Sequence, residues 1–139
     1  MTEIVLVVPG DLVPQGSKKA VMGGGRPQVV DVNEKKLKLW RGQIATAARL
    51  VYTGPLILDA VDVRLEFRVP RPKSVSEAKR PWPSVYPDVD KLARAVLDAL
   101  TGSVFKDDGQ VVDLRASKRY ADQPSVLIRV RLTQRREDQ

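Results

Sequence analysis

Two groups of aspartates are the residues of this 139-residue chain best placed to do chemistry. Asp88 and Asp90 open a segment with helical periodicity, and Asp107-Asp108 follows about one helix length later. Free backbone N–H groups and the helix dipole favour anions at the start of a helix. If the chain folds back after Gly102, an aspartate of the second group can meet the first group at one point.

Three carboxylates at one point need a counter-charge. At about 5 Å and an effective dielectric of about 20, each like-charged pair costs about 3 kcal/mol. Mg²⁺ is the natural candidate, with Mn²⁺ as a substitute, because it takes hard oxygen ligands and keeps waters. Such an ion activates water and stabilises charge on a phosphodiester. The chain has no histidine and no cysteine, which excludes disulfides, thiolate nucleophiles and metal sites built on those residues.

Each of these features also has a purely structural interpretation. Asp88 can be a helix N-cap, and Asp90 a favourable first-turn acid. The Asp107-Asp108-Gly109 run can be only a tight turn. Asp98 lies about 12 Å along the helix from Asp90, too far to share one ion, and is expected to pair with Arg94.

The charge of the chain is unevenly distributed. Between residues 87 and 113, six aspartates stand against three cations, so this segment carries −3 and the remainder of the +7 chain carries +10. A basic body around an acidic pocket suits an enzyme that acts on a polyanion, and a basic protein with scattered acids fits equally well. Trp82 and Tyr86 can stack on unpaired bases or simply pack locally. The candidate phosphate contacts are Lys18, Lys19, Arg26, Lys73, Lys79, Arg80, Lys118 and Arg119.

The elements that position these residues follow from hydrophobic periodicity. Helices are predicted over about 34–51 and 88–100, and strands over 4–8, 56–69, 111–119 and 126–133. The stretch 11–33 is basic and rich in Gly and Pro, which predicts a long irregular loop, and 134–139 is a polar tail. This order indicates one small α+β domain over residues 1–139, with two main helices packed on a mixed sheet of about four strands. No stretch is apolar for long enough to span a membrane, and no signal peptide is evident, so we expect a cytoplasmic protein.

Two blocks of this sequence resemble a known family. Residues 87–100 read Pro-Asp-Val-Asp-Lys-Leu-Ala-Arg-Ala-Val-Leu-Asp-Ala-Leu, and 104–113 read Val-Phe-Lys-Asp-Asp-Gly-Gln-Val-Val-Asp. They resemble the RusA family of Holliday-junction resolvases from bacteria and phages, which carries Asp-x-Asp-Asn-Leu, a downstream Asp-Ala-Leu and Asp-Asp-x-Gln-Val/Ile. The resemblance is dense over 71–132 and looser over 4–51. It implies a RusA-like fold and a homodimeric, Mg²⁺-dependent endonuclease that cuts four-way DNA junctions.

Carried over residue by residue, the resemblance implies catalytic metal ligands at Asp88, Asp90 and Asp108, with Asp107 as a helper. The family's catalytic lysine falls on Arg94, which keeps the positive charge but cannot donate a proton at neutral pH. We therefore expect Arg94 to stabilise charge or anchor a phosphate. Lys91 replaces the family's asparagine and is a further helper beside the metal site.

A homodimer suits a junction with near two-fold symmetry, because each of two acidic sites can address one of two opposed strands. Two other functions stay open. One is a non-catalytic module that binds junctions or forks and retains a remnant acidic site. The other is a small phosphohydrolase acting on nucleotides, which predicts an enclosed pocket and does not account for the +10 outside the acidic segment.

Overall fold

A computed structural model describes the backbone of residues 3–16, 18–23, 26–31 and 34–134, and the side chains of residues 3–16 and 34–134. Its elements in chain order are β1 (Ile4–Pro9), β2 (Lys18–Gly23), β3 (Arg26–Asp31), α1 (Glu34–Val51), β4 (Val61–Pro70), α2 (Val89–Leu100), the 3₁₀ turn η1 (Asp108–Gln110), β5 (Val111–Ala121) and β6 (Ser125–Leu132). Two helices and a mixed four-stranded sheet form a small α+β domain, as the sequence predicts.

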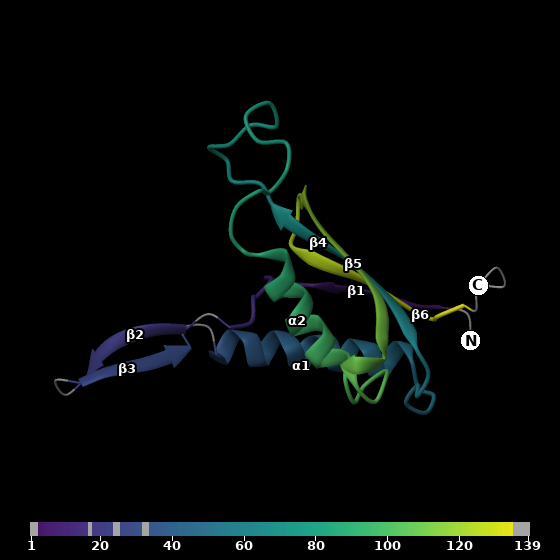
Figure 1. Cartoon of the computed structure of the whole chain (residues 1–139). Helices are drawn as coiled ribbons and strands as arrows, with labels where there is room; N and C mark the ends of the chain where they lie inside the picture. Colours follow the sequence, from purple (N-terminus) through teal and green to yellow (C-terminus); the bar gives the residue numbers. More distant parts are fainter. Residues whose placement is uncertain (1–2, 17, 24–25, 32–33, 135–139) are drawn as a thin grey trace.

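The strand order of the main sheet is β1-β6-β4-β5. β6 pairs antiparallel with both β1 and β4, whereas β5 runs parallel to β4. Two parallel neighbours require the chain to return along the sheet between them, and α2 makes this return (Figure 1). The start of α2 therefore lies at the end of the sheet where β4 finishes, and the end of α2 lies where β5 begins.

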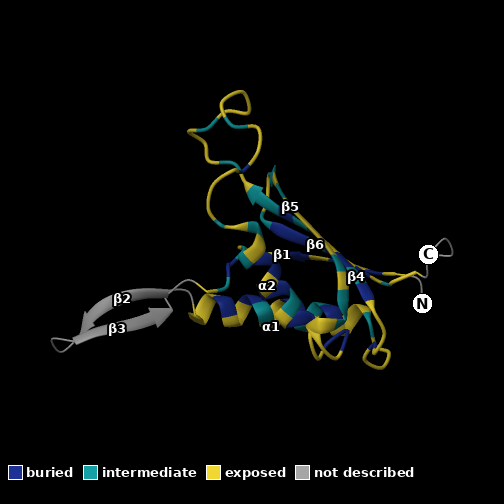
Figure 2. Ribbon diagram, in the orientation of Figure 1, coloured by how far each residue is buried: buried dark blue, intermediate teal, exposed yellow. Residues whose placement is uncertain are grey.

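The helices cover one face of the sheet and build the core with it (Figure 2). Alternation along β4 turns Val63, Leu65 and Phe67 inward, where all three are buried. The apolar stripe of α1 buries Trp40 at 2% exposure, as its spacing predicts. Truncating a fully buried ring such as Phe67 to alanine would cost about 3–5 kcal/mol. No helix within the described residues is long and apolar enough to cross a membrane.

The structure corrects two of the predicted elements. The stretch 11–33 is not a continuous irregular loop, because β2 and β3 pair antiparallel within it and form a hairpin that leaves the body beside the start of α1 (Figure 1). The strand expected from residue 56 begins at Val61. Before it, Ile57 makes only an isolated bridge with Phe105, because this segment turns to receive the loop that follows α2.

Candidate active site

The first turn of α2 carries the first pair of predicted site aspartates. Asp88 occupies the N-cap position, yet its side chain makes no capping hydrogen bond. Its Oδ2 lies 3.7 Å from Nζ of Lys91, a loose and exposed ion pair. Asp90 is exposed in the first helical turn. The N-cap interpretation thus accounts for the position of Asp88 but leaves its carboxylate available to a ligand.

The second pair lies in a turn with internal hydrogen bonds. Asp107 Oδ1 accepts from the backbone N–H of Gly109 at 3.2 Å, and the Asp107 N–H donates to Gln110 Oε1 at 2.8 Å. Gln110 Nε2 donates to the carbonyls of Ile57 and Asp59 at 2.8 and 2.9 Å. Asp107 therefore has a structural task, as the tight-turn interpretation predicts, and Gln110 fastens the turn to the segment before β4.

Asp108 is exposed, as is Asp107, and its environment is acidic. The hydrogen bond with the Asp107 side chain, slight desolvation and the negative charges of Asp107 and Asp98 raise the pKa of Asp108 above its ordinary value. The charge of Asp98 reaches Asp108 because both lie toward the C-terminal end of α2. Asp108 is therefore a carboxyl group for which a cation is a favourable neighbour.

One chain does not bring the two pairs together. Asp88 and Asp90 lie at the start of α2, and its 12 residues separate them from the turn by about 18 Å. The sheet gives a similar length, because Lys118, beside Pro87, is about 23 Å along β5 from Val111. Within the described residues, no three Asp or Glu side chains are grouped to hold a metal ion. The expected convergence after Gly102 is thus wrong for a single chain.

Lys118 connects the far end of β5 to the start of α2. Its Nζ donates to the carbonyl of Val85 at 2.7 Å and to that of Pro87 at 2.8 Å, on either side of the cis peptide bond Tyr86–Pro87. Lys118 was predicted as a DNA contact. Its ammonium instead satisfies two loop carbonyls and fixes the chain that enters Asp88.

The two cations that depart from the family pattern differ in their surroundings. Lys91 faces Asp88, whereas Arg94 is exposed and makes no ion pair within the described residues. The expected pair of Arg94 with Asp98 is wrong, because Asp98 lies 3.5 Å from Arg41 of α1. The packing of α1 against α2 offers Asp98 this partner, and Arg94 keeps its guanidinium for solvent or a ligand.

The other predicted phosphate contacts fall into three classes. Lys73 and Lys79 are exposed in the loop between β4 and α2. Arg80 and Arg119 are engaged, the first with the Tyr120 hydroxyl at 2.7 Å and the second with Glu66 at 3.3 Å. The side chains of three more lie outside the described residues: Lys18, Lys19 and Arg26.

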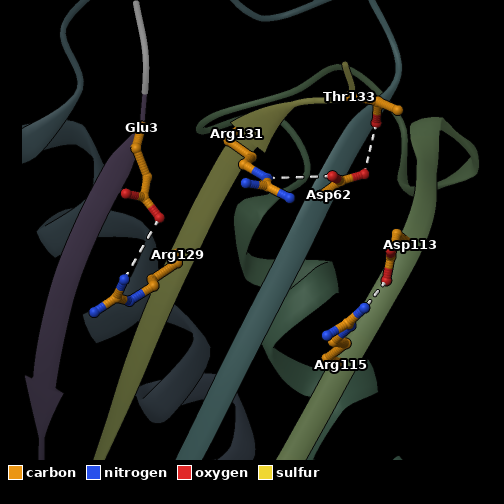
Figure 3. Close-up of polar contacts among 7 residues, drawn as sticks. All are labelled: Glu3, Asp62, Asp113, Arg115, Arg129, Arg131 and Thr133. Carbon is orange, nitrogen blue, oxygen red and sulfur yellow. Dashed lines mark hydrogen bonds and ion pairs between the residues drawn. The ribbon is translucent and has the colours of Figure 1, made fainter. Parts of the chain in front are cut away.

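Cations on the uncovered face of the sheet were missed as candidate contacts. Arg115 lies there on β5, and Arg129 and Arg131 lie on β6, with β4 between the two strands. Each is paired with an acid at 3.3–3.8 Å (Figure 3). Burial raises the pKa of Glu66 on this face, but hydrogen bonds from Arg68 and Arg119 outweigh burial and hold it below its ordinary value. The signal was present in the outward positions of the alternating strands, which include these three arginines.

Comparison with known proteins decides the family. The sequence pattern of the family described as Endodeoxyribonuclease RusA matches residues 9–131. The chain belongs to the RusA family. It is also 34% identical over 140 residues to a protein named "Uncharacterized protein YqaN" of Bacillus subtilis (strain 168), covering 92% of this chain and 95% of that protein. Membership in the RusA family confirms the resemblance and places the chain among endodeoxyribonucleases.

The RusA match covers both aspartate pairs, the loop between β4 and α2, and β5. This match spans nearly the whole chain, so an active site at the start of α2 and in the turn before β5 stays a prediction. Because these two places lie apart in one chain, the geometry requires either a site built on one pair alone or a site completed by another molecule.

Proposed function

We propose that this protein is a structure-selective endodeoxyribonuclease that depends on a divalent cation and cuts four-way DNA junctions in the bacterial cytoplasm. The observation that carries the proposal is the pair Asp88 and Asp90 in a RusA-family chain. Both carboxylates lie at a helix start, both are exposed, and Asp88 is not used for capping. The excess positive charge of the chain supports a polyanionic substrate.

The cation in this proposal is Mg²⁺, for which Mn²⁺ can substitute. Asp88 and Asp90 would hold it on one chain, and two carboxylates with waters and substrate phosphate are an ordinary set of ligands for this ion. The ion would supply charge neutralisation at the phosphate and an acidified water. Asp108, whose pKa is raised by its acidic neighbours, would contribute from a second copy of the chain.

The edge of the sheet at β5 supports a second copy. Within the described residues β5 pairs only with β4, so one side of an 11-residue strand has no neighbour. Val112 and Leu114 on this strand are 61% and 44% exposed. An unpaired strand that shows apolar side chains is a template for pairing with another chain. An isologous dimer would pair the free side of β5 and bury its exposed apolar side chains at once.

The register of such a dimer links it to the site. If two β5 strands pair antiparallel about a two-fold axis near Asp113, Val112 of one copy meets Leu114 of the other. Lys118 then lies opposite residue 108 of the other copy, because both are five positions from Asp113. Lys118 donates a hydrogen bond to the carbonyl of Pro87, the residue before Asp88. This register therefore brings Asp108 of one copy toward Asp88 of the other.

The remaining residues of the chain have roles that need no bound metal. Arg94 is one turn from Asp90 and is not held by an acid, so we assign it to phosphate anchoring and charge stabilisation. Lys91 limits the repulsion at Asp88. Lys118 orients the chain entering α2. Lys73 and Lys79 would bind backbone phosphates of the DNA arms and make binding salt-dependent.

The test is cleavage of a labelled four-way junction by the parent protein and by Asp90→Asn. We expect Mg²⁺ to produce nicked duplexes with the parent, and chelation to prevent this. Asp90→Asn should cut at least about 100-fold more slowly, while its junction binding is kept or tightened. Asp59→Asn removes an exposed charge before β4 but keeps the backbone carbonyl that Gln110 binds, so it serves as the control and should cut like the parent. Equal cutting by Asp90→Asn would show that the site is assigned wrongly.

A second candidate function is a non-catalytic module that binds junctions or forks. It is favoured by one observation, that the described residues of a single chain group no three carboxylates. The same experiment separates the two functions. A retarded band with no product at any Mg²⁺ or Mn²⁺ concentration would support the binding module over the nuclease.

A further inference from the structure

The loop between β4 and α2 presents a large aromatic side chain to solvent. Trp82 is 66% exposed, whereas Trp40, the other tryptophan, is buried. A tryptophan this open is unusual for packing alone, since its ring is among the largest apolar surfaces a chain can bury. We propose that the hollow beside Trp82 holds one unpaired base of branched DNA, which stacks on the indole. This inference rests on the proposed function, because it assumes a branched DNA substrate.

The hollow has a volume of about 450 Å³ and lies between the loop and the end of β5. Arg71 lies over the ring of Tyr120 at 4.1 Å from its centroid, and Arg80 Nε donates to the Tyr120 hydroxyl at 2.7 Å. Arg71 also donates to the carbonyls of Arg80 and Pro81. These contacts fix the backbone on both sides of Pro81, so the wall that carries Trp82 is positioned before any ligand arrives.

The chemistry of the lining favours a base over a phosphate. Trp82 and Tyr120 provide aromatic surface, and the guanidinium of Arg71 adds a planar cation. Glu77 and Asp122 also line the hollow and offset the charges of Arg71 and Arg119, so the lining has no net positive charge to attract a phosphate. The exposed cations Lys73 and Lys79 belong to the same loop. A base can therefore enter the hollow while the phosphates on either side of it meet these lysines.

The hollow lies close in the chain to the first pair of aspartates. Asp88 follows Trp82 by six residues, and Lys118 fastens the intervening carbonyls of Val85 and Pro87. A strand whose base stacks on Trp82 would thus pass within reach of the start of α2. Fully paired DNA offers no such base, so the hollow would contribute to selectivity for branch points.

The test compares two DNA duplexes that differ by one bulged nucleotide, in chelator so that no cutting occurs. We expect the parent to bind the bulged duplex more tightly than the perfect one. Trp82→Ala should weaken binding to the bulged duplex by about 5- to 100-fold and change binding to the perfect duplex by less than about twofold. Trp82→Phe should retain most of the affinity. Leu50→Ala, which removes another exposed apolar side chain, is the control and should bind like the parent.

Fluorescence provides a second readout that does not depend on affinity. The bulged duplex should quench the emission of exposed Trp82, and Trp82→Phe, which leaves only Trp40, should show no quenching. Equal loss of affinity for both duplexes, or no loss for either, would overturn the proposal, the latter result pointing to a protein ligand instead. The binding and fluorescence experiments do not measure cutting, so a negative result in them does not contradict the proposed nuclease activity. If instead Asp90→Asn cuts like the parent, base stacking on Trp82 can still be measured by binding.

Discussion

Nζ of Lys118 on β5 lies 2.8 Å from the carbonyl oxygen of Pro87, the residue before Asp88. This hydrogen bond joins an edge strand to the chain that enters the candidate active site. It places Lys118 in the architecture of the site, which differs from the direct DNA contact that its sequence context predicts.

Replacing Lys118 tests this architectural role. Lys118→Met removes two charge-assisted hydrogen bonds to backbone carbonyls, so we expect the free energy of unfolding to fall by about 1.5–3 kcal/mol. Lys73→Met, at an exposed position of the loop that carries these carbonyls, should stay within about 0.5 kcal/mol of the parent. Denaturant unfolding measures both. Equal stability of the two variants would assign Lys118 to DNA contact alone.

Mixing variants tests whether two chains complete one site. Asp90→Asn and Asp108→Asn should each be inactive alone. Their mixed dimer would contain one intact site, because each variant supplies the half that the other lacks, and nicking of a junction should return. A mixture of Asp88→Asn with Asp90→Asn lacks the same half in both chains and should stay inactive. Lack of recovery in the first mixture, with subunit exchange verified, would contradict the two-chain site.

The acidic turn makes a titration prediction. Asp107 raises the pKa of Asp108 through a hydrogen bond and through its charge, so Asp107→Asn should lower the pKa of Asp108. Asp98→Asn should lower it less, because Asp98 acts only through its charge. Carbon-detected NMR in metal-free buffer measures both changes. As a raised pKa keeps a carboxyl protonated to higher pH, Asp107→Asn should also leave Asp108 ionised at more acidic pH.

Gln110 holds the same turn to the segment before β4. Gln110→Ala removes two bonds to carbonyls and one from the Asp107 N–H, so we expect a loss of about 1–3 kcal/mol in the free energy of unfolding. Gln123→Ala, at an exposed position between β5 and β6, is the matched control and should be nearly neutral. Thermal or denaturant unfolding would decide, and equal costs for the two changes would contradict the anchoring role.

Substitutions of Arg94 test the effect of having arginine where the family has lysine. Arg94→Lys restores the family's residue at an exposed position with no ion pair to lose, so we expect cutting of a junction to be kept or increased. Arg94→Ala should slow cutting while leaving stability unchanged. Slower cutting by Arg94→Lys than by the parent would mean that the planar guanidinium is itself required.

Most of the fold was predictable because its core elements have clear periods. Val63, Leu65 and Phe67 alternate with charged residues, and the stripe of α1 repeats at three and four positions. The hairpin of β2 and β3 was missed because six glycines and prolines interrupt 11–33. In the part of the chain that the structure describes, the hairpin's strands pair only with each other. Their pairing therefore left no signature of a shared core in the sequence.

The residues of the candidate site stay a prediction, and their arrangement in one chain was not predicted. Its residue types and order lie in the sequence, and the family match covers them. Their distance depends on the parallel pairing of β4 with β5, which periodicity does not reveal. Once this pairing is known, α2 must separate Asp88 from Asp108 by its full length. Gln110 was also overlooked, since two of its three hydrogen bonds join residues that are more than fifty positions apart.

The separation of the aspartates by the length of α2 has a consequence for the cell. If the halves of each site come from different chains, a newly synthesised monomer cannot damage the chromosome, and cutting begins only once protein has accumulated enough to associate. Specific activity should then decline as the enzyme is diluted, and incisions should arise in pairs because every association creates two equivalent centres.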